Sequence, residues 1–182
     1  SYVGALRTLS AFRPTFAILG NHDGGVWAKQ RRGFADHILV ERILRDAAIT
    51  LLHNRSHQLD VSGRNINLIG VGDFWSDELD AETAFRSVAP SHASVLLSHN
   101  PDSKEALQRY KWDLMLCGHT HGGQVIIPFD GPRYAPVNDL RFVAGLKPWD
   151  GRQIYISRGV GNLGMVRFRC RPEVTVLDLH FA

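Results

Sequence analysis

The sequence has few cysteines, no long apolar run and little excess of charge. Its two cysteines, Cys117 and Cys170, are too few for a disulfide framework and lack the paired spacing of a zinc knuckle, so we expect both to be reduced core residues. No apolar stretch approaches the roughly 20 residues that a membrane-spanning helix needs. The 21 basic and 18 acidic side chains leave a formal charge of only +3, which is too weak to indicate a nucleic-acid partner.

The remaining composition is that of an ordinary globular chain. With 182 residues, of which 44% are hydrophobic and 21% charged, the chain is long enough to bury a substantial core. No repeat, low-complexity segment or linker indicates a second domain, so we expect residues 1–182 to form a single domain. Because Ser1 leads directly into a helical pattern without an initiator Met, we also expect this domain to be an N-terminally truncated fragment.

Hydrophobic periodicity predicts a mixed α/β fold. We expect helices over 2–12, 34–48 and 76–89, a further helix opening at Pro101, and strands over 15–19, 58–61, 66–71, 94–97, 113–117, 154–157 and 174–181. The pair joined by "SGRN" is typical of a hairpin, whereas 128–149, rich in Pro, Gly and Asp, predicts an extended loop. Strands alternate with helices early and pair as hairpins later, which indicates sheets covered by helices.

Four of the nine histidines share one position, directly after a predicted buried strand: His22, His99, His119 and His121. Because neighbouring strands lie about 5 Å apart, side chains at their ends can converge on one point. Imidazoles gathered in this way suit a transition-metal site, and Asn21 would add an amide oxygen. We expect the other five histidines to be structural or solvated: His37, His53, His57, His92 and His180.

The motif "GHTHGGQ" at 118–124 presents two histidines side by side. In an extended stretch, His119 and His121 would point the same way and could reach two ions about 3.5–4 Å apart, while the glycines let backbone and substrate approach. A structural zinc site built from Cys117, His119 and His121 is an open alternative. A single histidine after a strand is also often only a turn or core residue, but four of them make coincidence a weaker explanation.

Three blocks of sequence together resemble one family. "GNHD" at 20–23, "SHNPD" at 98–102 and "GHTHGGQ" at 118–124 are similar, in order and spacing, to the motifs of the calcineurin-like metallophosphoesterases. Residues 155–179 resemble the closing segment of the bacterial phosphodiesterase branch of that family. The resemblance implies a four-layer αββα sandwich, here lacking its N-terminal strands, with a dinuclear metal centre at the strand ends.

The resemblance also implies roles for individual residues. Asn21, His99 and His119 would bind one metal ion and His121 the other, with Mn expected and Zn, Fe or Ni as alternatives. His22 would be the catalytic histidine near the leaving group. Asp23 would orient His22, although it could instead only cap a turn.

The family pattern includes carboxylate ligands that these residues do not supply. It opens with Asp-x-His and Gly-Asp blocks before "GNHD", but the nineteen residues before Gly20 contain no Asp, Glu or His. Asp73, in "GVGDFW", follows a glycine but stands after the Asn-His block, so we expect it to have no metal role. Four neutral ligands then face two dications, and we expect these residues alone to be impaired as an enzyme.

Three functions stay open at this stage. The first is a metal-dependent phosphodiesterase, the second a pyrophosphatase acting on a nucleotide-linked lipid precursor, and the third a non-catalytic binding domain. The substrate would be a phosphodiester small molecule or a lipid-linked one, and the protein would be cytoplasmic or peripheral to the inner membrane, with an upstream anchor left open.

Two segments outside the motifs could contact substrate. Arg167, Arg169 and Arg171 alternate with apolar residues, so one face of a predicted strand over 164–172 would be basic and meet an anionic substrate, lipid headgroups or only solvent. The loop that carries Arg133, Tyr134, Arg141 and Trp149 could form a lid or simply pack.

Overall fold

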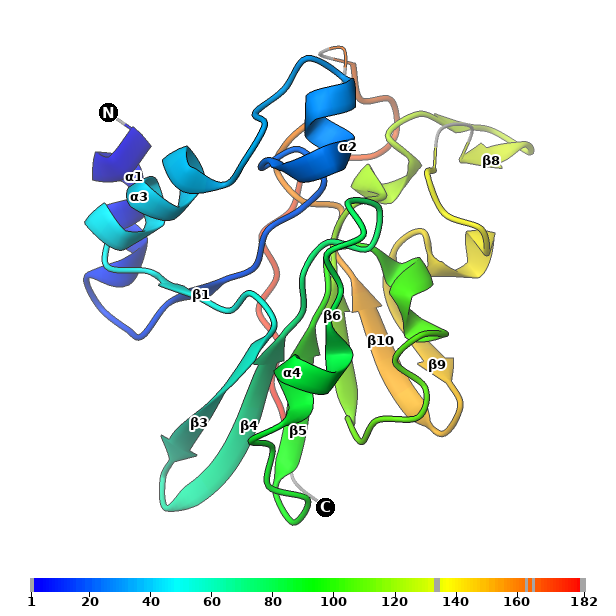
Figure 1. The fold of residues 1–182 in the computed structure, drawn as a ribbon. Helices are drawn as coiled ribbons and strands as arrows, with labels where there is room; N and C mark the ends of the chain where they lie inside the picture. The colour runs from blue at the N-terminus through cyan, green and yellow to red at the C-terminus, as the bar shows by residue number, and fades with distance from the viewer. Residues whose placement is uncertain (1, 133–134, 163, 165, 181–182) are drawn as a thin grey trace.

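The main structural element is a six-stranded mixed sheet. It is seen in a computed structural model that describes residues 2–132, 135–162, 164 and 166–180 (Figure 1). The strands lie in the order β3 (Arg55–Val61), β4 (Arg64–Gly70), β5 (Ala93–Leu97), β6 (Leu114–Cys117), β10 (Arg152–Ile156) and β9 (Gly145–Trp149). The four inner strands run parallel, while β3 and β9 pair antiparallel at the two edges.

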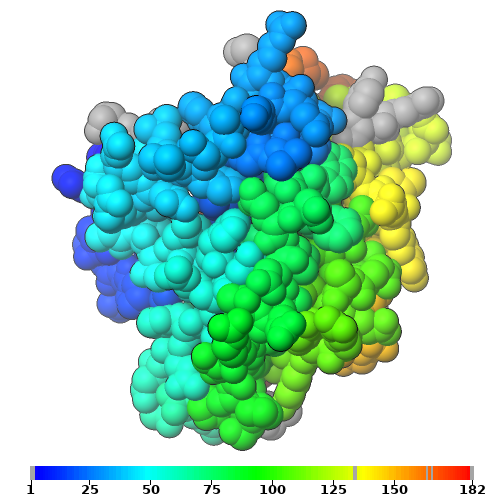
Figure 2. Space-filling model, viewed as in Figure 1, coloured from blue at the N-terminus to red at the C-terminus, as the bar shows by residue number. Residues whose placement is uncertain are grey.

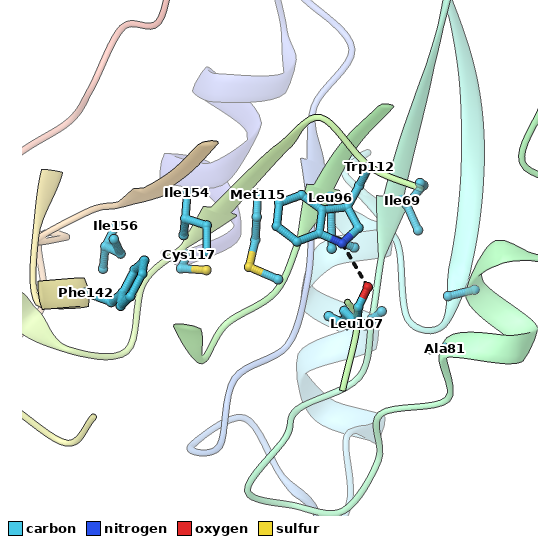
Figure 3. Packing of buried hydrophobic residues seen from close by; sticks show 12 residues of the cluster. Ile69, Ala81, Leu96, Leu107, Trp112, Met115, Cys117, Phe142, Ile154 and Ile156 are labelled. Carbon is cyan, nitrogen blue, oxygen red and sulfur yellow. Dashed lines mark hydrogen bonds between the residues drawn. The ribbon is translucent and has the colours of Figure 1, made fainter. Parts of the chain in front are cut away.

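One face of this sheet carries the main hydrophobic core. Ile69, Leu96, Met115 and Ile154 project from four neighbouring strands, and all four are fully buried (Figure 3). Helix α4 (Ala81–Phe85), the segment before β6 that holds Leu107 and Trp112, and Phe142 cover them. The Trp112 Nε1–H donates to the Leu107 carbonyl at 3.0 Å, so the buried indole leaves no polar atom without a partner.

A smaller layer lies beside the sheet at its β3 side. Helices α1 (Tyr2–Ser10) and α3 (Ile38–Asp46) pack on the short parallel pair β1 (Phe16–Ala17) and β2 (Thr50–Leu51) (Figure 1). Their shared core contains Leu19, Leu44, Ala47 and Ile49. In the space-filling view, the blue and cyan residues around α2 (Gly25–Gln30) and α3 lie directly against the green segment that follows β4 (Figure 2).

The central strands confirm the mixed α/β prediction. The predicted hairpin is β3–β4, and the predicted strands at 94–97, 113–117 and 154–157 correspond to β5, β6 and β10. The described residues do not form the predicted four-layer sandwich. They contain the six-stranded sheet and two pairs of two-residue strands, β1–β2 and β7 (Ile126–Ile127) with β8 (Gly131–Pro132). The expectation of a single truncated domain stays a prediction.

Several predicted boundaries and one predicted loop are wrong. The helices are shorter than expected, and Pro101 opens only the 3₁₀ turn η1 (Pro101–Lys104). The segment 128–149 contains β8, the 3₁₀ turn η3 (Leu140–Phe142) and β9, because the Asp150–Gly151 turn, with φ of 50° and 72°, folds β9 back on β10. Residues 174–180 form no strand, since their backbone meets no strand edge. The structure also adds α2 and the 3₁₀ turn η2 (His121–Gly123), neither of which was expected.

Candidate metal and phosphoester site

Three loops meet at one edge of the main sheet. The parallel strands β5 and β6 end side by side, and the chain continues into His99 and His119, with the Gly118 N–H donating to the His99 carbonyl at 3.0 Å. The third loop follows β1, which belongs to the smaller layer and not to the main sheet. The site therefore forms between the two layers, a geometry that strand order within one sheet does not predict.

Asn21 joins the two histidines. Its Oδ1 lies 3.0 Å from Nε2 of His99 and 3.1 Å from Nδ1 of His119, and the two imidazole centroids are 5.0 Å apart. Two ligand atoms that share one metal ion lie about 3 Å apart when each metal–ligand bond is about 2.1 Å long, so this spacing suits a shared ion. Asn21 is 2% exposed, so its amide oxygen is directed into the protein and not to solvent.

The electrostatic setting keeps both imidazoles neutral. Burial, together with the nearby His121 and His22, lowers the pKa of His99 to about 4. Burial and the neighbouring His99, His121 and His22 lower the pKa of His119 to about 3. A neutral imidazole is the form that binds a metal ion, so the donors at this edge are in their ligand state at neutral pH.

The donors at this edge are few. Among the described residues, Nδ1 of His119 faces Asn21, so its buried Nε2 lies on the other side of the ring and does not add to this donor set. Within the same part of the chain, no three His, Cys, Asp or Glu side chains gather closely enough to hold a metal ion. The donors that do converge are two imidazoles and the Asn21 amide, which together fit one divalent ion.

A pocket of about 290 Å³ opens over these donors. All four motif histidines and Asn21 line it, together with Trp27, Trp75 and Pro136. His22 is exposed at the pocket, and its ring meets Trp27 edge-on with the centroids 4.6 Å apart. Trp75 contacts His119 in the same way at 4.3 Å, and the two indoles lie 5.7 Å from each other.

The Asp23 carboxylate accepts a hydrogen bond from the backbone of its own loop. Its Oδ2 accepts the Gly20 N–H at 2.8 Å, and its carbonyl accepts from Nδ1 of His37 at 3.3 Å. No hydrogen bond recorded among the described residues joins Asp23 to His22, so the orienting role stays a prediction, whereas the turn cap is observed. A Cβ on Gly20 would stand only 2.7 Å from the His99 ring, which explains why glycine precedes Asn21.

The "GHTHGGQ" loop is not extended. His119 and His121 have φ values of 66° and 51°, and Gly122 and Gln124 are also left-handed, at 64° and 50°. The argument that the two histidines point the same way because they lie two apart on a strand is therefore wrong. Such conformations are unfavourable for non-glycine residues and persist only where surrounding contacts hold them.

The cysteines rule out the structural zinc alternative. The side chain of Cys117 packs in the main hydrophobic cluster beside Met115 and Ile154, away from the pocket, and burial raises its pKa. Cys170 is also buried, and both thiols are free, as predicted. Asp73 lies outside the pocket, where burial raises its pKa and it accepts the Ser76 N–H at 2.8 Å.

The predicted basic strand face is wrong. Among the described residues of 164–172, only Phe168 forms a ladder contact, a single bridge to Val125. Arg167 turns inward, while Arg169 and Arg171 stay exposed.

For the loop that could form a lid or simply pack, the described residues favour packing. Arg141 pairs with Asp139 on the surface, and Trp149 stacks on Trp112 at 5.8 Å, which is a packing role. Arg133 and Tyr134 lie outside the described residues.

Comparison with known proteins identifies the family and several relatives. The sequence profile described as calcineurin-like phosphoesterase matches residues 1–123. Phosphodiesterase YaeI of Escherichia coli K12 is 42% identical over 179 residues, covering 98% of this chain and 63% of that protein. UDP-2,3-diacylglucosamine pyrophosphatase LpxG of Chlamydia trachomatis is 31% identical over 194 residues, covering 96% and 57%. The chain thus spans less than two thirds of these relatives, and no solved structure matches it.

Proposed function

This chain belongs to the calcineurin-like phosphoesterase family, and we propose that the protein is a metal-dependent phosphodiesterase. The observation that carries the proposal is the convergence of the Asn21 amide oxygen, His99 and His119 within 3.0–3.1 Å contacts at the floor of a pocket. One amide oxygen and two neutral imidazoles form a donor set of the kind that binds a transition-metal ion.

Each pocket residue has a proposed role. Asn21, His99 and His119 hold one divalent ion, expected to be Mn, and His121 contributes to a second. When bound, such ions supply an activated water and a clamp for the phosphoryl oxygens. His22, exposed and held against Trp27, faces the departing oxygen and offsets the negative charge that develops there.

A second candidate reaction is pyrophosphate hydrolysis on a nucleotide-linked lipid precursor. It is supported by the name of the relative from Chlamydia trachomatis and by the apolar indoles beside the imidazoles, which could contact a non-phosphate part of the substrate. A non-catalytic binding domain is the third candidate, because Asp23 is the one acidic side chain lining the pocket as described, and its carboxylate is engaged by Gly20.

The fold and the cellular setting belong to the same proposal. We expect the complete domain to be a four-layer sandwich, in which the second face of the main sheet packs on another layer. None of the helices in the described part of the chain is long and apolar enough to cross a membrane. The protein would act in the cytoplasm or at the periphery of the inner membrane.

The test is turnover of bis-p-nitrophenyl phosphate by the full-length protein, with and without added Mn. Metal-dependent turnover that falls at least about 100-fold in Asn21→Ala and His119→Ala would support the phosphodiesterase. Much faster turnover of a nucleoside diphosphate lipid than of the diester would favour the pyrophosphatase. Metal binding without turnover of either substrate would favour the binding domain and overturn the proposed activity.

A further inference from the structure

Arg167 directs its guanidinium into the protein and donates to backbone carbonyls. Its NH2 donates to the Arg158 carbonyl at 2.7 Å, and its NH1 donates to the His121 carbonyl at 3.1 Å. Its Nε donates to the Gly161 carbonyl at 3.1 Å, and NH2 makes a second, shorter contact with that oxygen. A planar guanidinium suits this cluster of carbonyls, which also includes those of Gly159 and Cys170 at 3.4 Å, because its five N–H donors point in fixed, divergent directions.

The Gly161 carbonyl connects this guanidinium to the ring of His121. Nδ1 of His121 lies 3.2 Å from the Gly161 oxygen, the same oxygen that Arg167 binds. A carbonyl has two lone pairs and can accept from both groups. Because the carbonyl can only accept, Nδ1 must carry the proton, so in the neutral ring the lone pair of His121, a residue that lines the pocket, is on Nε2.

The same segment also holds the main chain of His121. The Cys170 thiol donates to the carbonyls of His121 and Gly122 at 3.2 and 3.4 Å. A Cβ on Gly122 would stand 2.5 Å from the Arg158 side chain and 2.7 Å from the Cys170 sulfur, so the two segments are in close contact. Contacts from Arg158, Arg167 and Cys170 therefore add to the hydrogen bonds of the loop itself in holding the left-handed φ of His121, 51°.

Within the proposed function, we propose that Arg167 is a positioning residue for His121. It fixes the backbone of His121 and the carbonyl that selects the Nδ1–H form of its ring, so that Nε2 faces the pocket. Unlike His99 and His119, His121 makes no hydrogen bond to Asn21 among the described residues. It needs this separate support, and Arg167 provides it from the C-terminal segment.

The first test does not depend on metal or activity. In the chelator-treated full-length protein, long-range ¹H–¹⁵N spectra of the imidazoles report which nitrogen of His121 is protonated. In the wild type we expect the Nδ1–H tautomer. In Arg167→Lys, which keeps the positive charge but loses the planar set of guanidinium donors, we expect a mixture of the Nδ1–H and Nε2–H tautomers. A wild-type His121 that is protonated on Nε2 overturns the proposal whether or not the variant folds.

The second test compares Arg167→Lys with Arg169→Lys. Arg169 is an exposed neighbour in the same segment, so its substitution is matched in chemistry but removes none of these bonds. For Arg167→Lys we expect Mn affinity at the weaker site to fall about 10-fold or more, with kcat reduced and KM for the diester little changed. Arg169→Lys should match the wild type. Equal Mn affinity in both variants, with unchanged thermal stability, would contradict a positioning role.

The two tests separate this inference from the proposed function. If the wild type fails to hydrolyse any phosphoester, the activity proposal is lost, yet the protonation state of His121 still decides the role of Arg167. If activity is present but His121 has the other tautomer, only the inference about Arg167 fails.

Discussion

At the scale of single residues, the amide oxygen of Asn21 is the shared contact of the site. One amide oxygen serves two buried imidazole nitrogens, and its removal would leave both without their shared partner. For Asn21→Ala we expect Mn affinity to fall by at least about 10-fold, because one ligand is lost and the two rings are freed. Isothermal titration with Mn measures this change.

Asn65 offers a matched control for that substitution. It is an exposed asparagine on β4, remote from the pocket, so Asn65→Ala should bind Mn as the wild type does. An Asn21→Ala protein that keeps wild-type affinity would show that the ion binds elsewhere and would contradict the assigned ligands.

The residues that short motifs carry could be predicted, whereas those that act through distant contacts could not. Asn21, His99 and His119 each follow a strand, which the sequence predicts, but the meeting of the Asn21 loop with the main sheet depends on the packing of two layers. Trp75 lies 44 positions before His119 in the chain, and nothing in its local pattern indicates a ring contact. Arg167 sits in an alternating run that predicts a strand, and only the folded backbone shows that its partners are carbonyls.

At the scale of elements, the "GHTHGGQ" loop depends on Gly122. Alanine there would adopt an unfavourable φ of 64° and press its Cβ against Arg158 and Cys170. We expect Gly122→Ala to lower the free energy of unfolding by roughly 2–3 kcal/mol, as measured by urea denaturation.

Gly151 separates the two causes in that prediction. Its φ is 72°, similar to that of Gly122, but a Cβ there would meet nothing within 4 Å. Gly151→Ala should therefore lower the free energy of unfolding by only about 1 kcal/mol, the backbone contribution alone. Equal losses in the two variants would show that close packing of residues 158–170 on the loop contributes nothing.

A histidine–carboxylate pair ties the "GNHD" loop to the segment after β4. Nε2 of His37 lies 2.9 Å from both Glu78 oxygens, and its Nδ1 contacts the Asp23 carbonyl. Burial by itself would lower the pKa of His37, but the bonds to Glu78 and Asp23 and the charges of Glu78 and Glu41 outweigh it, so the pKa is raised overall. His53, whose own pKa is lowered chiefly by burial, faces the same pair.

The raised pKa of His37 predicts a loss of stability toward high pH. The folded state holds the proton more tightly than the unfolded chain, so the stabilisation is complete below about pH 6.5 and disappears as the pH rises through the folded pKa. Glu78→Gln should therefore lower the free energy of unfolding by about 1 kcal/mol near pH 6 and by less near pH 9.

Asp139→Asn provides the control for the pH prediction. It breaks an exposed pair with Arg141, and neither partner titrates between about pH 6 and pH 9. Its effect should be small and constant over that range. A Glu78→Gln deficit that stays constant with pH would contradict the assignment to His37.

A strand can be predicted when its own residues indicate it, but not when it depends on a pairing partner elsewhere in the fold. β5 and β6 are buried apolar runs whose own composition predicts a strand. β9 carries Pro148 and lies in a segment with several prolines and glycines, so its own residues do not predict a strand. It forms a strand because a tight turn brings it beside β10, with which it pairs. Residues 174–180 show the reverse case, since alternating apolar residues predict a strand but find no ladder partner.

At the scale of the whole molecule, the second face of the main sheet is apolar and poorly covered. A cavity of about 710 Å³ lies on it, lined by side chains of β3 to β6, including Leu59, Leu68 and Leu116, and by Leu177 and Leu179 of the C-terminal segment. Leu177 and Leu179 are 38% and 49% exposed, so the segment covers this face incompletely. An apolar surface of this kind normally packs against another layer.

That surface predicts where a hydrophobic dye binds to the 182-residue chain. The fluorophore 8-anilinonaphthalene-1-sulfonate should bind the open sheet face with enhanced emission, and amide shifts in ¹H–¹⁵N spectra should change most along β3 to β6. Phe129, 111% exposed on the β7–β8 turn, is the internal comparison, because a lone exposed ring offers no enclosed surface. Shifts confined to that turn, or an absence of dye binding, would show that this face is already covered and would remove the physical reason for expecting a second layer on it.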